Sequence, residues 1–166
     1  MIKVRQGCFE TNSSSTHAIC IPDVSSYVPR HVAFGIGEYG WATDEAAPED
    51  YLYTAILCVY GDTDEQLNEK LDQLKKILNY NGISYTFVEP QWYEGTKYRW
   101  LDNGSIDHSD ETQELIDDLL ADEQLLLRYL GGAEICTGND NSDYSKAGEL
   151  YDEKVAAGWR CYWKGN

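Results

Sequence analysis

Residues 63–80 carry the pattern that most constrains the fold. Leucines recur there at positions 67, 71, 74 and 78, the spacing that places apolar side chains on one face of a helix. A capping box formed by Thr63 and Gln66 fits the start of this helix, and an Asn-Gly pair fits its end. A strand-like run follows directly at residues 83–88. A helix with one apolar face next to a strand favours a layered domain in which helices pack on a sheet.

The remaining patterns predict an α+β fold, with a mixed or antiparallel sheet and about four helices packed on it, because strands and helices alternate without a regular βαβ repeat. No linker or repeat divides the 166 residues, so residues 1–166 are expected to form a single domain. Further helices are predicted over residues 48–60, 110–121, 122–130 and 143–157. Further strands are predicted over residues 1–5, 16–21, 32–36, 98–101, 134–137 and 159–163, with a polar turn joining the first two as a hairpin.

The charge is strongly negative, with 29 Asp and Glu against 13 Lys and Arg and a formal net charge of −16. Direct binding to nucleic acid is disfavoured, since it depends on Lys and Arg neutralising phosphates. An acidic surface instead attracts basic proteins, including nucleic-acid-binding proteins whose groove it can occupy as a mimic. The plainer interpretation is that the acidic surface serves solubility.

The five cysteines are widely spaced, with no C-x-x-C pair. No signal peptide or membrane-spanning run is recognised, so we expect a reduced cytoplasm, no membrane association, and cysteines that serve as small core residues. A zinc site can be drawn from Cys8, His17, Cys20 and His108, but its spacing matches no standard ligand pattern. No metal or cofactor is therefore predicted.

The segment before residue 18 is the first candidate site. Six hydroxyl or amide residues in a row, Thr11 to Thr16, lead into His17 and an apolar strand. Ser15 and His17 would share one face of that strand, as nucleophile and base, and Asp107 could orient the imidazole as in a triad. The alternative is a capped turn with His17 exposed. Candidate ligand-binding residues here are Asn12, Ser13, Ser14 and Thr16.

Three further polar segments are candidates for the same ligand site. Asp107 and His108 stand at a predicted helix start, where an anion or a metal can bind, although Ser and Asp are also ordinary caps there. The loop at residues 137–141 can cradle a phosphate or ribose, with Thr137, Asn139 and Asp140 as candidates, although a plain turn fits it as well. In the glycine-rich segment 35–41, Glu38 is a candidate base and Trp41 a stacking platform, the alternative being a tight loop with Trp41 in the core.

A row of carboxylates follows His108 without an intervening Lys or Arg. With the apolar residues of helix 110–121 buried, these carboxylates would form one negative face, which is the candidate partner-binding surface. A solvated helix face is the usual meaning of such a run. The residues are Asp110, Glu111, Glu114, Asp117, Asp118 and Asp122.

The motif FETNSSSTH at residues 9–17 resembles small acidic proteins of unknown function from phages and prophages of Gram-positive bacteria. GEYGW at residues 37–41, SIDHS at 105–109 and TGNDN at 137–141 resemble further parts of the same pattern. The resemblance implies a phage accessory protein acting in the cytoplasm of a bacterial host. It implies no particular reaction.

Two functional hypotheses follow. The first is an acidic binding protein that inhibits a basic host protein of nucleic-acid handling or defence by mimicking nucleic acid. The alternative is a nucleotide- or metal-binding protein, or a hydrolase, whose site is built from Ser13–His17, Asp107–His108 and Asn139–Asp140. A homodimer is compatible with either hypothesis if aromatic residues such as Trp92, Tyr93, Trp100 and Trp163 are exposed.

Overall fold

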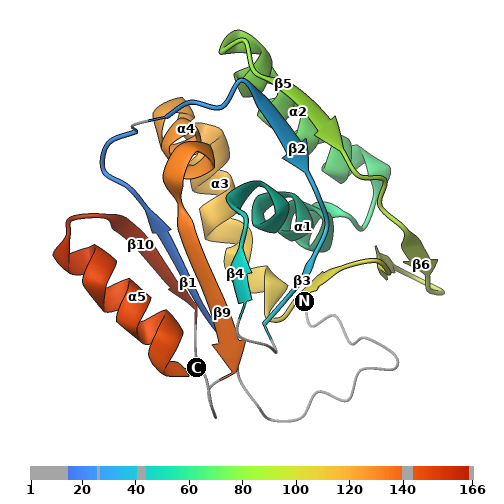
Figure 1. Ribbon diagram of the computed structural model, residues 1–166. Coiled ribbons are helices and arrows are strands. Elements are labelled where there is room, and N and C mark those ends of the chain that lie inside the picture. The colour runs from blue at the N-terminus through green and yellow to red at the C-terminus, as the bar shows by residue number, and fades with distance from the viewer. Residues whose placement is uncertain (1–14, 26, 41–43, 140–143, 165–166) are drawn as a thin grey trace.

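A four-stranded antiparallel sheet lies at the centre of the computed structural model, which describes residues 15–25, 27–40, 44–139 and 144–164 (Figure 1). Its strand order is β10-β1-β9-β4. The strands are β1 (Ser15–Ile21), β4 (Asp44–Ala46), β9 (Glu134–Asn139) and β10 (Arg160–Lys164). The central strand β1 is buried along its whole length, because neighbouring elements cover both of its faces.

The two faces of β1 pack against different helices. Ala18 packs with Cys136 and Ala147 beneath α5 (Tyr144–Ala156). Ile19 and Ile21 point the other way, into the main core, as the alternation of side chains along a strand requires. That core is filled by the four helices α1 (Pro48–Tyr60), α2 (Asp64–Tyr80), α3 (Gln113–Ala121) and α4 (Glu123–Gly132). The sheet therefore separates α5 from the other helices (Figure 1).

Three two-stranded sheets extend the fold beyond the central sheet. Strand β2 (His31–Phe34) pairs in parallel with β5 (Ser84–Phe87), which follows α2 (Asp64–Tyr80). Strand β3 (Glu38–Tyr39) pairs in parallel with β8 (Ser105–Ile106), just before the short 3-10 helix η1 (Ser109–Thr112). Strands β6 (Trp92–Glu94) and β7 (Arg99–Leu101) form an antiparallel pair.

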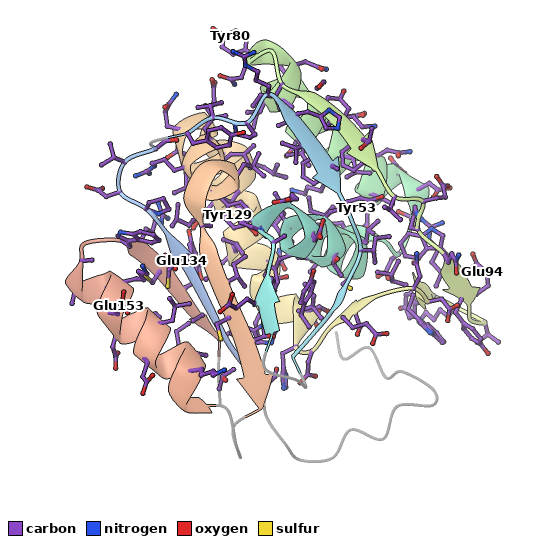
Figure 2. All side chains as sticks on the ribbon, in the orientation of Figure 1. Tyr53, Tyr80, Glu94, Tyr129, Glu134 and Glu153 are labelled. Atoms are coloured by element: carbon purple, nitrogen blue, oxygen red, sulfur yellow. The ribbon has the colours of Figure 1, made fainter. Side chains whose placement is uncertain are left out.

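Buried tyrosines connect the helices of the main core. Tyr129 of α4 donates a hydrogen bond to the carbonyl of Pro48 at 2.7 Å, which ties α4 to the start of α1. Tyr53 of α1 donates to the carbonyl of Val88 at 2.9 Å, just beyond β5. Both side chains lie in the interior of the molecule (Figure 2). These bonds satisfy hydroxyl groups that would be costly to bury alone.

The α+β prediction is confirmed, with five α-helices rather than about four among the described residues. Helix α1 has the predicted bounds, and Thr63 caps α2 by accepting a bond from the Gln66 amide. Asp122 caps α4 through the Leu125 amide and so separates α3 from α4. Gly158, two residues after the end of α5, has φ of 83°, a backbone conformation that favours glycine.

The predicted and observed secondary structure differ mainly in short elements. The helix predicted from residue 110 begins as η1 and becomes α-helical only at Gln113. Strands β3, β4, β6 and β8 were not predicted, since two or three residues show no alternation. The strand predicted over residues 1–5, and with it the hairpin to β1, lies outside the described residues. In the part of the chain that is described, no helix is long and apolar enough to span a membrane.

Candidate functional site

Helix α1 positions the glycine-rich segment that precedes β3. The Gly35 amide donates to the Asp50 carboxylate at 2.6 Å, and the Gly37 amide donates to the Thr54 hydroxyl at 3.1 Å. Thr54 in turn donates to the carbonyl of Asp50 at 2.7 Å. Polar groups on one side of α1 therefore hold residues 35–37 against the helix, and this fixes where β3 begins.

Strand β3 then brings Asp107 beside β1. Its parallel pairing with β8 ends where the Asp107 amide donates to the carbonyl of Tyr39 at 3.0 Å. A Cβ placed on Gly40, whose φ is 129°, would lie 2.5 Å from Cβ of Asp107 and 3.4 Å from Cβ of Ser15. Only glycine fits at this close approach, and Asp107 and Ser15 both lie next to Gly40.

Ser15 and His17 form a hydrogen-bonded pair, as expected for residues on one face of a strand. Ser15 Oγ lies 3.0 Å from His17 Nε2, and the hydroxyl of Tyr51 in α1 lies 2.9 Å from His17 Nδ1. The exposed fractions are 4% for Ser15, 1% for His17 and 0% for Tyr51. The expectation of an exposed His17 was wrong, because the main core encloses this face of β1.

Burial sets the charge of His17. Loss of solvent lowers the pKa of His17 to about 4, which outweighs the nearby Asp107 carboxylate that raises it. His108 and Lys164 lower the pKa further; Lys164 lies opposite His17 where β1 pairs with β10. The imidazole is therefore neutral at pH 7, the state in which one ring nitrogen can accept a proton.

Asp107 acts on His17 electrostatically, whereas the contact at Nδ1 belongs to Tyr51. The triad arrangement with Asp107 bonded to the imidazole is thus replaced by a Ser15–His17–Tyr51 chain. Asp107 instead lies 3.9 Å from His108 Nε2. His108 is half-exposed and has a left-handed backbone, with φ of 54°, which is uncommon for a residue other than glycine.

The segment at residues 137–139 lies directly beside β1. Strand β9 pairs Thr137 with His17, Gly138 with Thr16 and Asn139 with Ser15. The Thr16 hydroxyl donates to the carbonyl of Gly138 at 3.3 Å, on the face opposite to His17. Thr137 is fully buried, while Glu38 at the start of β3 is exposed.

The structure thus brings together parts of all four polar segments singled out in the sequence. Residues 15–17, 38–40, 105–108 and 137–139 meet at one end of β1. The remaining predicted ligand-binding residues lie outside the described part of the chain: Asn12, Ser13, Ser14, Trp41 and Asp140.

The zinc arrangement drawn from the sequence does not form. His17 and Cys20 are three residues apart on β1 and so point to opposite faces of the sheet. Among the described residues, no cluster of three or more His, Cys, Asp or Glu side chains is placed to hold a metal ion.

Sequence reasoning missed Tyr51 and Lys164. Tyr51 lies in a helix of mostly apolar residues, where a tyrosine is normally read as a core side chain. Its hydroxyl becomes significant only when α1 packs against β1. Lys164 could have been found only from the register that places it opposite His17.

The predicted acidic face is divided by internal bonds. The Asp117 carboxylate accepts from Tyr60 at 2.6 Å and lies 3.4 Å from Lys70. The Asp118 carboxylate accepts from Arg160 at 3.0 Å and from Tyr162 at 2.6 Å. The other predicted partner-binding residues, which are exposed and form no ion pair with another described residue, are Asp110, Glu111, Glu114 and Asp122.

Comparison of the chain with protein-family models, with curated proteins and with solved structures finds no match.

Proposed function

We propose that the protein binds a small ligand at the end of β1 and has hydrolase chemistry there, with Ser15 as nucleophile and His17 as general base. The observation that carries this proposal is the 3.0 Å contact between Ser15 Oγ and His17 Nε2 at the point where the four polar segments meet. A nucleophile, a base within hydrogen-bond reach and a third group that orients the base are the parts such a reaction needs.

The proton follows a simple path. When Nδ1 of His17 carries the ring proton and donates it to the Tyr51 oxygen, Nε2 is free to accept from Ser15. As Ser15 Oγ attacks a carbonyl or phosphoryl centre, its proton moves to Nε2, and the Asp107 carboxylate stabilises the imidazolium that forms. The imidazolium then gives this proton to the leaving group as the bond to that group breaks. Lys164, opposite His17 on β10, lowers the pKa of the imidazole and so favours release of this proton from the imidazolium. A water molecule that loses a proton to the same imidazole releases the acyl or phosphoryl group and restores the Ser15 hydroxyl.

Covalent labelling tests this role of Ser15. The protein is treated with a small alkyl fluorophosphonate, which phosphonylates a serine only when a base activates it, and the adduct is located by peptide mass spectrometry. We expect one adduct, on Ser15, formed at least about a hundredfold more slowly in His17→Gln, the scale of general-base assistance. A protein that remains unlabelled would mean that the pair is only a buried polar network joining β1 to α1.

Ser84 provides a matched control. Its Oγ lies 2.7 Å from Nδ1 of His31, in an exposed Ser–His contact. The Ser84 hydroxyl donates its proton to the carbonyl of Arg30 at 3.3 Å, so His31 does not receive it. Ser84→Ala should therefore leave the labelling unchanged, whereas Ser15→Ala should abolish it. An adduct on Ser84 would contradict the proposal.

A second candidate function is favoured by the exposed carboxylates of η1 and α3. These side chains are exposed and can meet a basic protein, in keeping with the charge of −16. Asp122, between α3 and α4, is also exposed, and its carboxylate caps α4. The resemblance to phage proteins suggests the setting, an accessory protein in a bacterial cytoplasm that inhibits a nucleic-acid-handling or defence protein of the host. The surface consists of Asp110, Glu111, Glu114 and Asp122.

Charge reversal separates the two functions. Glu111→Lys with Glu114→Lys should abolish capture of a basic host protein and leave Ser15 labelling unchanged. The control is Glu149→Lys with Asp152→Lys, an equal charge change at two exposed positions of α5, across the sheet. If both double variants capture the same proteins as the parent, the acidic surface has no such partner.

A further inference from the structure

Two cysteines lie directly opposite each other on neighbouring strands. In the antiparallel register of β1 and β10, Cys20 is the partner of Cys161. Residues opposite each other in such a pair have Cα atoms about 4.5 to 5.5 Å apart. A disulfide requires a Cα separation of about 4.4 to 6.8 Å. The backbone therefore already holds the two residues at disulfide distance.

The two thiols also lie near enough to affect each other: Cys161 raises the pKa of Cys20, and Cys20 lowers the pKa of Cys161. Both side chains lie on the face of the sheet that carries α5, since Cys20 shares that face with Ala18 and Cys161 is its cross-strand partner. Cys20 is fully buried, whereas Cys161 is partly exposed near the edge of the sheet. The other two described cysteines differ, because Cys58 lies on a helix and Cys136 pairs across the sheet with Ala18 and Glu45.

We propose that Cys20 and Cys161 form a reversible cross-strand disulfide when the protein meets a small-molecule disulfide such as oxidised glutathione. The Cys161 thiolate attacks one sulfur of oxidised glutathione, which forms a mixed disulfide and releases one glutathione thiolate. The Cys20 thiolate then attacks Cys161 Sγ and releases the second glutathione. Two protein thiols are oxidised, and one glutathione disulfide is reduced to two glutathione molecules.

Exposure assigns the order of the two steps. Cys161 is the thiol that a solute can reach, and Cys20 is positioned to resolve the mixed disulfide from beneath it. Burial raises the pKa of both thiols, while the nearby Lys154 ammonium lowers both. Lys154 lies 2.6 Å from Glu134, the partner of Cys20 on β9. Glu153, on α5 itself, lies 3.5 Å from the same ammonium (Figure 2).

The bond would fasten the edge strand to the centre of the sheet. Strand β10 pairs only with β1 in the described sheet, and it also packs against α5. A covalent link at Cys161 restrains β10 at the second of its five residues. Oxidation is therefore expected to raise the unfolding temperature, because the linked chain has fewer unfolded conformations.

The test uses the full chain, equilibrated with oxidised and reduced glutathione at several ratios, trapped with an alkylating agent and mapped by mass spectrometry. We expect a peptide pair joined through Cys20 and Cys161, lost on adding dithiothreitol, with an unfolding temperature that rises and falls with it. The pair should persist in Cys58→Ser and in Cys136→Ser and disappear in Cys161→Ser, whose fold is checked by circular dichroism.

Three outcomes would overturn the proposal. Glutathione that stays attached to Cys161 would show that Cys20 cannot resolve it. A bond from either cysteine to a different cysteine would show that another pair reacts instead. Both thiols remaining free at the most oxidising ratio would show that the pair serves only as packing.

Discussion

At His17, burial and hydrogen bonding act on the same proton. The pKa of His17 falls from 6.5 to about 4 on folding, so between these values the unfolded chain binds more protons than the folded one. Stability from this residue is then fully present above pH 6.5 and is lost as the pH falls toward 4, by about 3 kcal/mol at pH 4. Urea unfolding of the wild type and of His17→Gln, at pH 7 and at pH 4, measures this loss. The wild type should exceed His17→Gln in free energy of unfolding by less at pH 4 than at pH 7.

The comparison of the wild type with His17→Gln also separates the effect of pH on His17 from its effect on the carboxylates. The wild type and His17→Gln share every Asp and Glu, so acid effects from those groups cancel in the difference. A difference between the two proteins that stays constant from pH 7 to pH 4 would contradict the buried, neutral imidazole.

Tyr51 and Tyr53 form a matched pair on α1. Tyr51→Phe removes the hydroxyl bonded to His17, and Tyr53→Phe removes one bonded to the carbonyl of Val88. Each change leaves a buried group unpaired, so each should cost about 1–3 kcal/mol in urea unfolding. Only Tyr51→Phe should also slow fluorophosphonate labelling of Ser15. Equal labelling rates in the two variants would mean that Tyr51 does not position His17.

The residues of the site differ in how well their contacts could be predicted from the sequence. The Ser15–His17 contact follows from the two-residue period of a strand, and it was predicted. The burial of His17 was not predicted, because it depends on α1, β3 and β8 closing over one end of β1. Tyr51 lies 34 positions from His17, and no local pattern marks which hydroxyl of a helix will meet it.

At the scale of the element, Asp118 connects α3 to the edge of the sheet. Its carboxylate accepts bonds from Arg160 and Tyr162 of β10. Asp118→Ala should therefore destabilise the protein by about 1–2 kcal/mol in urea unfolding, whereas Glu114→Ala on the exposed face of α3 should stay within about 0.5 kcal/mol. Equal losses in the two variants would show that the bonds to β10 contribute nothing.

Elements were predictable in proportion to their length. Helices α1 and α2 carry 13 and 17 residues, enough for an apolar stripe and its caps to be recognised. Strands β3 and β8 carry two residues each, and they exist because Asp50 and Thr54 fix the chain before β3. Their parallel pairing depends on tertiary contacts, so the sequence alone could not reveal it.

For the whole molecule, the excess of carboxylates predicts the response to salt. With a net charge of −16, the folded chain repels itself more than the expanded chain does. Raising potassium chloride from about 0.01 M to about 0.3 M shortens the screening length from about 30 Å to below 10 Å, so the free energy of unfolding should rise. The rise should be smaller in Glu149→Lys with Asp152→Lys. A free energy of unfolding that falls with salt would mean that ion pairs such as Arg99–Asp64 outweigh the repulsion.

The meeting of the four polar segments is a property of the whole fold. Each segment was recognisable as a polar interruption, yet the order β10-β1-β9-β4 and the pairing of β3 with β8 decide that they meet. Strand order depends on long-range packing that no single segment encodes. The sequence therefore indicated which segments are candidates for the site, but it did not indicate that they lie together.

The most direct test is the protonation of His17, read by long-range proton–nitrogen NMR on histidine-labelled protein at pH 7, with the exposed His31 and His108 as internal references. The prediction is a neutral ring with its proton on Nδ1, donated to Tyr51, and Nε2 free to accept from Ser15. A proton on Nε2 would contradict it, because the imidazole would then donate to Ser15 and could not serve as its base.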